Sequence, residues 1–340
     1  MPSPPESPSS SRLLELLDAF PGRRIALYAD LVVDRFIRGT PKRISREAPV
    51  LILHQDSEEV VPGGGANAVL NVRALGGSPQ PVGVVGDDDN GRALLGRFEA
   101  EGIAVGGILT RPGTRTPSKT RILAGARHAI KQQIVRFDSD DEVALGDDDR
   151  NGLAGRLRAA ADGAEALIVS DYGQGGVEPG LVPTGGTCPV LADSRYRLPD
   201  FAGIDGATPN EEELDVLEPG EAEAAPERAG RLRQRLGATF VLLTRGSGGM
   251  VLSTSAGAVA IPVHGTDQVA DVTGAGDTVI GTFALATAAG ADPLEAALLA
   301  NYAGGVVVMK LGTATASADE LRTAIRSDPR PREELRWVGS

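Results

Sequence analysis

Short apolar runs alternate with amphipathic stretches along most of the chain, from Arg23 onward. Four runs have the length and apolar content of buried strands: 23–30, 165–171, 188–194 and 238–246. Four stretches between them have the spacing of amphipathic helices: 66–75, 91–102, 150–161 and 227–237. Strands that alternate with helices of this length usually pair in parallel and are covered on both faces. The pattern therefore predicts an α/β fold with a mostly parallel central sheet.

Two segments, about 35–61 and 114–137, break this alternation, because they carry β-type runs with no helix between them. They predict a small antiparallel sheet that lies over the main domain as a lid. Neither segment is large enough to fold alone, so we expect one domain over residues 23–326. Residues 1–22, rich in Ser and Pro, are expected to form a largely disordered tail, and 327–340 a C-terminal tail.

In parallel α/β sheets, ligands bind beyond the carboxyl ends of the strands. Three acidic residues stand at the ends of predicted strands: Asp30, Asp171 and Asp193. This rule makes all three candidates for a ligand site.

Composition narrows the function classes. The chain has 34 basic and 46 acidic side chains, a formal charge of −12, which argues against nucleic-acid binding but not against a small anion in a local positive pocket. The only cysteine is Cys188, so no disulfide forms within the chain, and a reducing cytoplasm is expected. No apolar run reaches the ~18 residues of a membrane helix, and the first dozen residues lack the apolar core of a signal peptide.

The most informative stretch is DVTGAGDT (271–278), in which a Gly-Ala-Gly turn opens a long helix of small residues. The amides of Gly274, Ala275 and Gly276 would point out of the helix N-terminus and form an anion site. Two roles are open for Asp277 in that position. It could cap the helix, or it could act as a general base beside a transferring phosphoryl group.

DVTGAGDT resembles the ATP-site motif of the ribokinase-like, or PfkB, sugar kinases. Three further elements follow the pattern of that family: PGGGAN (62–67), TPNEEE (208–213) and LLTRGSGGM (242–250). The likeness covers roughly residues 23–326 and keeps the order of the family's motifs. It implies a three-layer ribokinase-like fold with a β-lid and a transfer, dependent on ATP and Mg²⁺, to a sugar alcohol.

A narrower likeness is to D-glycero-D-manno-heptose 7-phosphate kinases. It rests on ADLVVDRFIRGTPKRISREAPV (29–50), KTRILAGARHAIKQQIVRFD (119–138), SDYGQG (170–175) and VVVMKLGTAT (306–315). Ala29 replaces the usual Gly, and Phe36 replaces the usual Tyr. Bifunctional members carry a nucleotidyltransferase domain after the kinase, and we expect only the kinase half here.

On the sugar side, Asp30 and Asp34 are expected to accept hydrogen bonds from sugar hydroxyls, and Asn67 to bridge two more. Gly63 and Gly64 would let the backbone approach the sugar. The alternatives are a helix N-cap for Asn67 and a flexible turn for the glycines.

On the nucleotide side, the resemblance assigns Asn210, Glu213, Thr244, Gly246 and Gly249 to ATP and Mg²⁺. Asn210 and Glu213 are too few for a dedicated protein cage and suit a Mg²⁺ ion held mainly by water and phosphates. TPNEEEL also has the form of a helix start, so a capping role for Asn210 and Glu213 is equally concrete.

A sugar phosphate needs cations. Arg43, Lys119, Arg121 and Arg136 lie in or next to the lid segments. Each alone is an ordinary surface charge, but Lys119 and Arg121 follow the subfamily pattern and are our candidates.

Together these features predict a sugar kinase that phosphorylates D-glycero-β-D-manno-heptose 7-phosphate at the anomeric hydroxyl to give the 1,7-bisphosphate, with Asp277 as base. Two alternatives stay open. One is a PfkB-type kinase of ribose, fructose or a hexose phosphate. The other is a catalytically silent sugar or nucleotide sensor. A homodimer through the lid is expected by resemblance.

Overall fold

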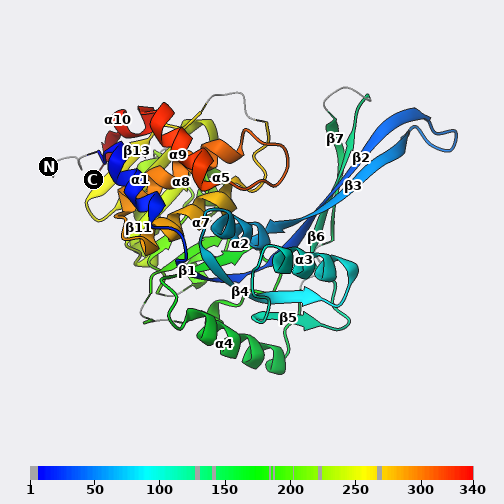
Figure 1. Ribbon diagram of the computed structural model, residues 1–340, viewed down its shortest axis with the longest axis horizontal. Helices are drawn as coiled ribbons and strands as arrows, with labels where there is room; N and C mark the ends of the chain where they lie inside the picture. The colour runs from blue at the N-terminus through cyan, green and yellow to red at the C-terminus, as the bar shows by residue number, and fades with distance from the viewer. Residues whose placement is uncertain are drawn as a thin grey trace.

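The computed structural model describes residues 7–126, 131–139, 143–183, 185–186, 188–201, 203–220, 224–265 and 270–339. Figure 1 shows a body in which helices enclose a large sheet, and a slender second sheet that projects away from the body.

The central sheet has ten strands. Their order is β14 (Arg336–Gly339), β13 (Gly257–Ile261), β12 (Met250–Thr254), β11 (Phe240–Thr244), β10 (Gly206–Ala207), β9 (Val190–Ser194), β8 (Ala166–Asp171), β1 (Arg24–Ala29), β4 (Ser78–Gly86) and β5 (Ile108–Arg111). The strands from β5 to β11 pair in parallel, and β12 to β14 add an antiparallel edge. The predicted mostly parallel sheet is confirmed.

Strand β1 shows why the sheet is covered on both faces, since its side chains alternate between two apolar cores. Ile25 and Leu27 belong to one core, and Ala26 and Tyr28 belong to the other. The first core includes residues of α1 (Ser10–Asp18), α2 (Gly65–Ala74), α3 (Asp89–Ala100), α7 (Ala275–Ala288), α8 (Pro293–Val307) and α9 (Ala318–Ser327). The second includes residues of α4 (Asp147–Ala161), α5 (Glu211–Leu217) and α6 (Ala225–Leu236). This is the predicted three-layer α/β fold. Within the described ranges, no helix is long and apolar enough to cross a membrane.

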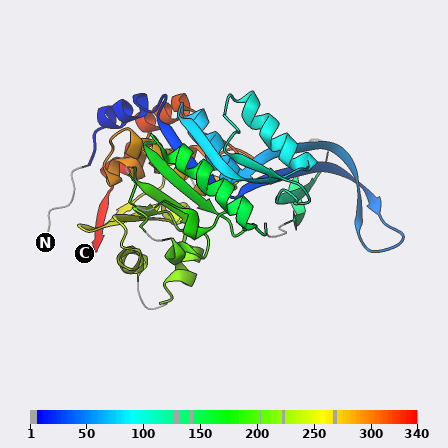
Figure 2. The same ribbon diagram turned by 90° about the horizontal axis from the view of Figure 1, so that it is seen from below.

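The projecting sheet, called the lid sheet below, has the strand order β3 (Leu51–Gly64), β2 (Leu31–Ile44), β6 (Ser118–Ala124) and β7 (Gln132–Ser139). Figure 2 shows the β2–β3 hairpin extending far beyond the body. The predicted antiparallel sheet is wrong at one place, because β2 and β6 pair in parallel. The sheet consists of two hairpins, β2–β3 and β6–β7. In each hairpin the first strand runs outward from the body, so β2 and β6 run in the same direction.

Both predicted tails contain regular structure in their described parts. Residues 10–18 form α1, capped by Ser9, and Leu13, Leu16, Leu17 and Phe20 are buried against the body. Their spacing is that of an amphipathic helix, so the prediction of a largely disordered tail is wrong for these residues. At the other end, α10 (Arg330–Glu333) precedes β14, which extends the central sheet by pairing with β13.

Candidate active site

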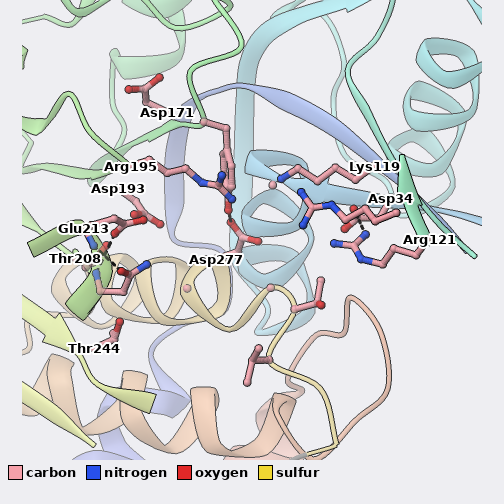
Figure 3. A pocket seen from close by; sticks show the side chains of 18 residues that line it. Asp34, Lys119, Arg121, Asp171, Asp193, Arg195, Thr208, Glu213, Thr244 and Asp277 are labelled. Atoms are coloured by element: carbon pink, nitrogen blue, oxygen red, sulfur yellow. Dashed lines mark hydrogen bonds and ion pairs between the residues drawn. The ribbon is translucent and has the colours of Figure 1, made fainter. Parts of the chain in front are cut away.

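Two cavities adjoin at the carboxyl ends of the parallel strands. The first, of about 380 Å³, faces the lid sheet and is called the substrate cavity below. The second, of about 480 Å³, lies over α7 and α8 and is called the nucleotide cavity below, after the ligand that the sequence predicts for it. Both are lined by Asn210, Thr244, Val272 and Gly276, so the boundary between them lies at the start of α7. Figure 3 shows the side chains of the substrate cavity.

Asp277 lies at this boundary, in the first turn of α7, and is 2% exposed. Asn67 Nδ2 donates to its Oδ2 (3.1 Å), and the Tyr172 hydroxyl donates to its Oδ1 (2.8 Å). Burial raises the pKa of Asp277 to about 7, although both hydrogen bonds favour the ionised form. A carboxylate with a pKa near 7 is suited to accept and release a proton at physiological pH. The helix-cap reading is excluded, because the N-cap of α7 is Gly274.

The helix start that is predicted to be an anion site offers two of the three expected amides. Gly274 has φ +80°, and a Cβ there would lie 2.4 Å from Asn67 Nδ2, so only glycine fits. The Ala275 amide already donates to the carbonyl of Val272 (3.2 Å), which removes it from the predicted set of donors. The amides of Gly274 and Gly276 have no acceptor among the described residues, so they can bind an anion.

Asn67 holds Asp277 instead of facing the substrate cavity. It lies inside α2, whose N-cap is Gly64, so the alternative of a helix cap is wrong as well. Besides Asp277, its Nδ2 donates to the carbonyl of Gly274 (3.3 Å), and its Oδ1 accepts from Asn71. Asn67 does not line the cavity, and the predicted contact with sugar hydroxyls is not supported.

Asp34 lines the substrate cavity, as predicted for a sugar-binding carboxylate. It forms a buried ion pair with Arg121 and accepts from the Thr313 hydroxyl (2.8 Å). A Cβ on Gly63 would lie 2.5 Å from Asp34 Oδ2, and Gly64, which lines the cavity, has φ +52°. These glycines therefore provide close packing around Asp34 and are not a merely flexible turn.

Asp30 does not line the substrate cavity, which corrects its predicted role. Its buried carboxylate accepts backbone N–H groups of Tyr172 (2.8 Å), Gln174 (3.0 Å) and Gly176 (3.0 Å). Burial raises the pKa of Asp30 to about 6, and the three backbone donors oppose that rise. Asp30 fixes the segment after β8 and does not contact the cavity.

Four cations line the substrate cavity: Lys119, Arg121, Arg136 and Arg195. Figure 3 shows Lys119 and Arg121 on one side of Asp277 and Arg195 on the other. Burial lowers the pKa of Lys119. The remaining predicted cation, Arg43, is on the exposed outer part of β2 and does not line this cavity.

Sequence reasoning missed Arg195 and Tyr172. Lys119 Nζ lies 4.8 Å from the centre of the Tyr172 ring, and Arg195 Cζ lies 5.4 Å from it. Both are cation–π contacts. Both residues follow the ends of parallel strands, beside Asp171 and Asp193. The rule that ligands bind beyond the carboxyl ends of parallel strands could therefore have found them, if it had been applied to the residues that follow each strand as well as to the acidic residue at its end.

The acidic end of the substrate cavity contains Asn210, Glu213, Asp193 and Thr208. Asn210 and Glu213 form the capping box of α5, with both hydrogen bonds at 2.9 Å, so the capping alternative is confirmed. Both nevertheless line the cavity. Burial raises the pKa of Asp193 and of Glu213, and the charge of Glu213 raises that of Asp193 further.

This acidic end fits Mg²⁺. The Thr208 hydroxyl is buried and has no hydrogen-bond partner among the residues that the structure describes, and oxygen atoms of Asn210 and Glu213 border the same space. In the part of the chain that the structure describes, no three His, Cys, Asp or Glu side chains are grouped to hold a metal by themselves. An ion here would be completed by water and phosphate oxygens.

The nucleotide cavity is mostly apolar, and it is lined by Thr244, Gly246 and Gly249, which the resemblance assigns to ATP and Mg²⁺. Its apolar wall is formed by Met250, Val263, Val272, Val279 and Val308. Gly304 and Gly305 of α8 also line it, and a Cβ on Gly304 would lie 3.3 Å from Val279 Cγ2. Small residues here keep this apolar space open.

Comparisons with known proteins identify the family and the fold. The model of the pfkB family carbohydrate kinases matches residues 24–146 and 184–320. The curated relatives named Bifunctional protein HldE from Mesorhizobium japonicum and Pelobacter propionicus are 39% and 37% identical to the chain and cover 94% and 87% of it. The chain spans only 65% and 62% of the length of these relatives.

Among solved structures, phosphofructokinase-2 from Escherichia coli in complex with potassium has a TM-score of 0.72 at 19% identity and covers 90% of this chain and 98% of its own. Ribokinase from Arabidopsis thaliana, complexed with ribose and ATP, has a TM-score of 0.68 at 18% identity and covers 90% of this chain and 100% of its own. These likenesses show the ribokinase-like fold. The family model matches more than half of the chain, so the chain belongs to the pfkB family of carbohydrate kinases, phosphotransferases that act on a sugar hydroxyl.

Proposed function

We propose that this protein transfers the γ-phosphoryl group of ATP to the anomeric hydroxyl of D-glycero-β-D-manno-heptose 7-phosphate. The hydroxyl oxygen bonds to the γ-phosphorus, the bond from that phosphorus to the ADP oxygen breaks, and Asp277 takes the hydroxyl proton. The observation that carries the proposal is the place of Asp277, buried where the cationic substrate cavity meets the apolar nucleotide cavity.

The two cavities supply binding for the two substrates. The apolar wall of the nucleotide cavity suits the adenine ring, and its boundary at Gly276 brings the phosphates to the start of α7. The amides of Gly274 and Gly276 then stabilise negative charge on the transferring group. Bound Mg²⁺, held through Glu213, Asn210 and Thr208, would supply neutralisation of the ATP phosphates.

A phosphorylated sugar is favoured over a neutral one by the charges of the substrate cavity. Lys119 and Arg195 contact the Tyr172 ring and form no ion pair within the described residues, so their charges are available to an anion. Arg121 is already paired with Asp34, which suits it to orient that carboxylate toward sugar hydroxyls. The choice of a heptose rests on the resemblance of residues 29–50, 119–138, 170–175 and 306–315 to heptose 7-phosphate kinases.

The experiment is ADP release by the purified protein with ATP, Mg²⁺ and a panel of sugars. The panel holds heptose 7-phosphate, the same heptose without phosphate, ribose, fructose and hexose phosphates. We expect the highest kcat/KM with heptose 7-phosphate and a product whose new phosphorus resonance is that of an anomeric phosphate. Higher kcat/KM with another sugar would overturn the heptose assignment. Absence of release with every sugar would favour the sensor.

The homodimer through the lid sheet stays a prediction. Its support is a set of exposed apolar side chains on that sheet: Ile44, Leu51, Ile134, Val135 and Phe137. A second copy would cover them. Light scattering after gel filtration tests it, and a mass of one chain across micromolar concentrations would contradict it.

A further inference from the structure

Tyr172 has the most specific contacts of the site residues that the sequence did not predict. Its hydroxyl donates to Asp277 Oδ1 at 2.8 Å, and it follows β8 directly. The other oxygen of Asp277 accepts from Asn67 at 3.1 Å. Because each carboxylate oxygen has its own donor, the carboxylate is held in one orientation, with its remaining lone pairs available to the cavity.

The backbone that bears Tyr172 is itself held. Asp30 lies between the last residue of β1 and the first residue of β2, where the chain passes from the central sheet to the lid sheet. There its carboxylate accepts the N–H groups of Tyr172, Gln174 and Gly176. A Cβ on Gly176 would lie 2.9 Å from Asp30 Oδ1, which shows how closely the segment wraps the carboxylate. One buried side chain therefore fixes three backbone groups in five residues.

The Tyr172 ring is held as well. Lys119 of β6 lies 4.8 Å from the ring centre, and Arg195, after β9, lies 5.4 Å from it. The two cations approach from elements that are far apart in sequence, so the ring is fixed between the lid sheet and the central sheet. Cations beside the ring also strengthen its hydroxyl as a donor.

We propose that Tyr172 is a positioning residue for the catalytic base, and that Asp30 acts through the 172–176 backbone to set its hydroxyl. This inference rests on the proposed role of Asp277 but not on the identity of the sugar. Tyr172 orients the carboxylate toward the acceptor hydroxyl and stabilises its ionised form. Asp30, predicted from the sequence as a sugar ligand, is the anchor of this arrangement.

The charged groups that face Asp277 come from several elements, and each affects its titration. Asp34 of β2 and Asp193 of β9 disfavour the ionised form, Lys119 of β6 favours it, and Arg195 lines the same cavity. The hydrogen bond from Tyr172 also favours the ionised form of Asp277. Its removal should therefore raise the pKa of Asp277 and move the acidic limb of the kcat profile to higher pH.

The first test is Tyr172→Phe, which keeps the ring between the two cations and removes only the hydroxyl. We expect kcat to fall roughly 10- to 100-fold, since a hydrogen bond to a charged group is lost, with both KM values within about threefold. The acidic limb of kcat should move to higher pH. The matched control is Tyr28→Phe. The Tyr28 hydroxyl accepts from Glu178 N (2.9 Å), which follows the same segment, and does not reach Asp277. This control should keep the wild-type kcat and acidic limb.

The second test is Asp30→Asn, which leaves the Tyr172 side chain intact. It should lower kcat and shift the limb in the same direction. In the Tyr172→Phe background the same change should have little further effect, because the two residues act through one hydroxyl. Additive losses would overturn the role of Asp30. A Tyr172→Phe enzyme with wild-type kcat and limb, or an equal loss in Tyr28→Phe, would overturn the role of Tyr172. A wild-type protein that is inactive with every sugar would instead refute the proposed function.

Discussion

The substrate cavity and the nucleotide cavity meet at the first turn of α7 but differ in the polarity of the side chains that line them. The substrate cavity is lined by four cations and by buried carboxylates such as Asp34, Asp171 and Asp277. The nucleotide cavity has an apolar wall of valines, Met250 and glycines, and the charged residues Glu211, Glu212 and Arg245 also line it. Charges that are held by specific partners control orientation and protonation, whereas small apolar residues control only the available space. A substitution in the substrate cavity should therefore affect mainly kcat. A substitution of similar size in the nucleotide cavity should affect mainly the KM for ATP.

The largest effect is expected for Asp277→Asn. The substitution keeps the size of the side chain and removes the base, so kcat should fall about 10²–10⁴-fold. ATP affinity, measured by calorimetry, should stay within about threefold, because the nucleotide cavity is unchanged. An Asp277→Asn protein that retains wild-type turnover would show that another group takes the proton.

Arg121→Met should have the next largest effect. Of the partners of Asp34 in the described part of the chain, it leaves only the Thr313 hydroxyl, which is costly for a buried carboxylate. We expect kcat/KM for the sugar to fall roughly 10- to 100-fold and the free energy of unfolding to fall by about 3 kcal/mol.

The control for Arg121→Met is Arg38→Met. Arg38 pairs with Glu59 on the exposed part of the same sheet, and such a pair contributes about 0–1 kcal/mol. Denaturant unfolding and steady-state kinetics measure both variants. Equal stability losses in the two would contradict the difference between the buried and the exposed pair.

The smallest effect is expected on the nucleotide side. In Gly304→Val the added methyl groups project from α8 toward Val279 and reduce the nucleotide cavity. The KM for ATP should rise about tenfold, equivalent to about 1.4 kcal/mol of lost binding, with kcat nearly unchanged. Gly304→Ala is the matched control and should raise KM much less. If Gly304→Val lowered kcat and left the KM for ATP unchanged, the proposed difference between the two cavities would be contradicted.

Much of the fold could be predicted because it depends on local patterns. The alternation of apolar runs and amphipathic stretches predicts the central sheet and its helices. The parallel pairing of β2 with β6 depends on where two hairpins leave the body, which no local pattern encodes. The helix at 10–18 was predictable in principle, since Leu13, Leu16, Leu17 and Phe20 follow the helical period.

The candidate site divides in the same way. The helix start at 274–277 could be found from a contiguous motif. The hydrogen bond between Tyr172 and Asp277 joins residues 105 positions apart and has no sequence signature. Asp30 and Asp34 are equivalent by pattern. They differ in the structure because Asp30 lies at the junction of two sheets and faces the 172–176 backbone, while Asp34 lies in β2 at the cavity.

The central claim is that a buried Asp277 is the catalytic base, and the pH dependence of kcat at saturating ATP, Mg²⁺ and sugar tests it most directly. Burial raises the pKa of this carboxyl to about 7, so the base is ionised above that pH and protonated below it. We predict a plateau above about pH 8 and a loss approaching tenfold per pH unit below pH 7. A kcat that stays constant down to pH 5, as expected for a base with an ordinary carboxyl pKa of about 4, would contradict the claim.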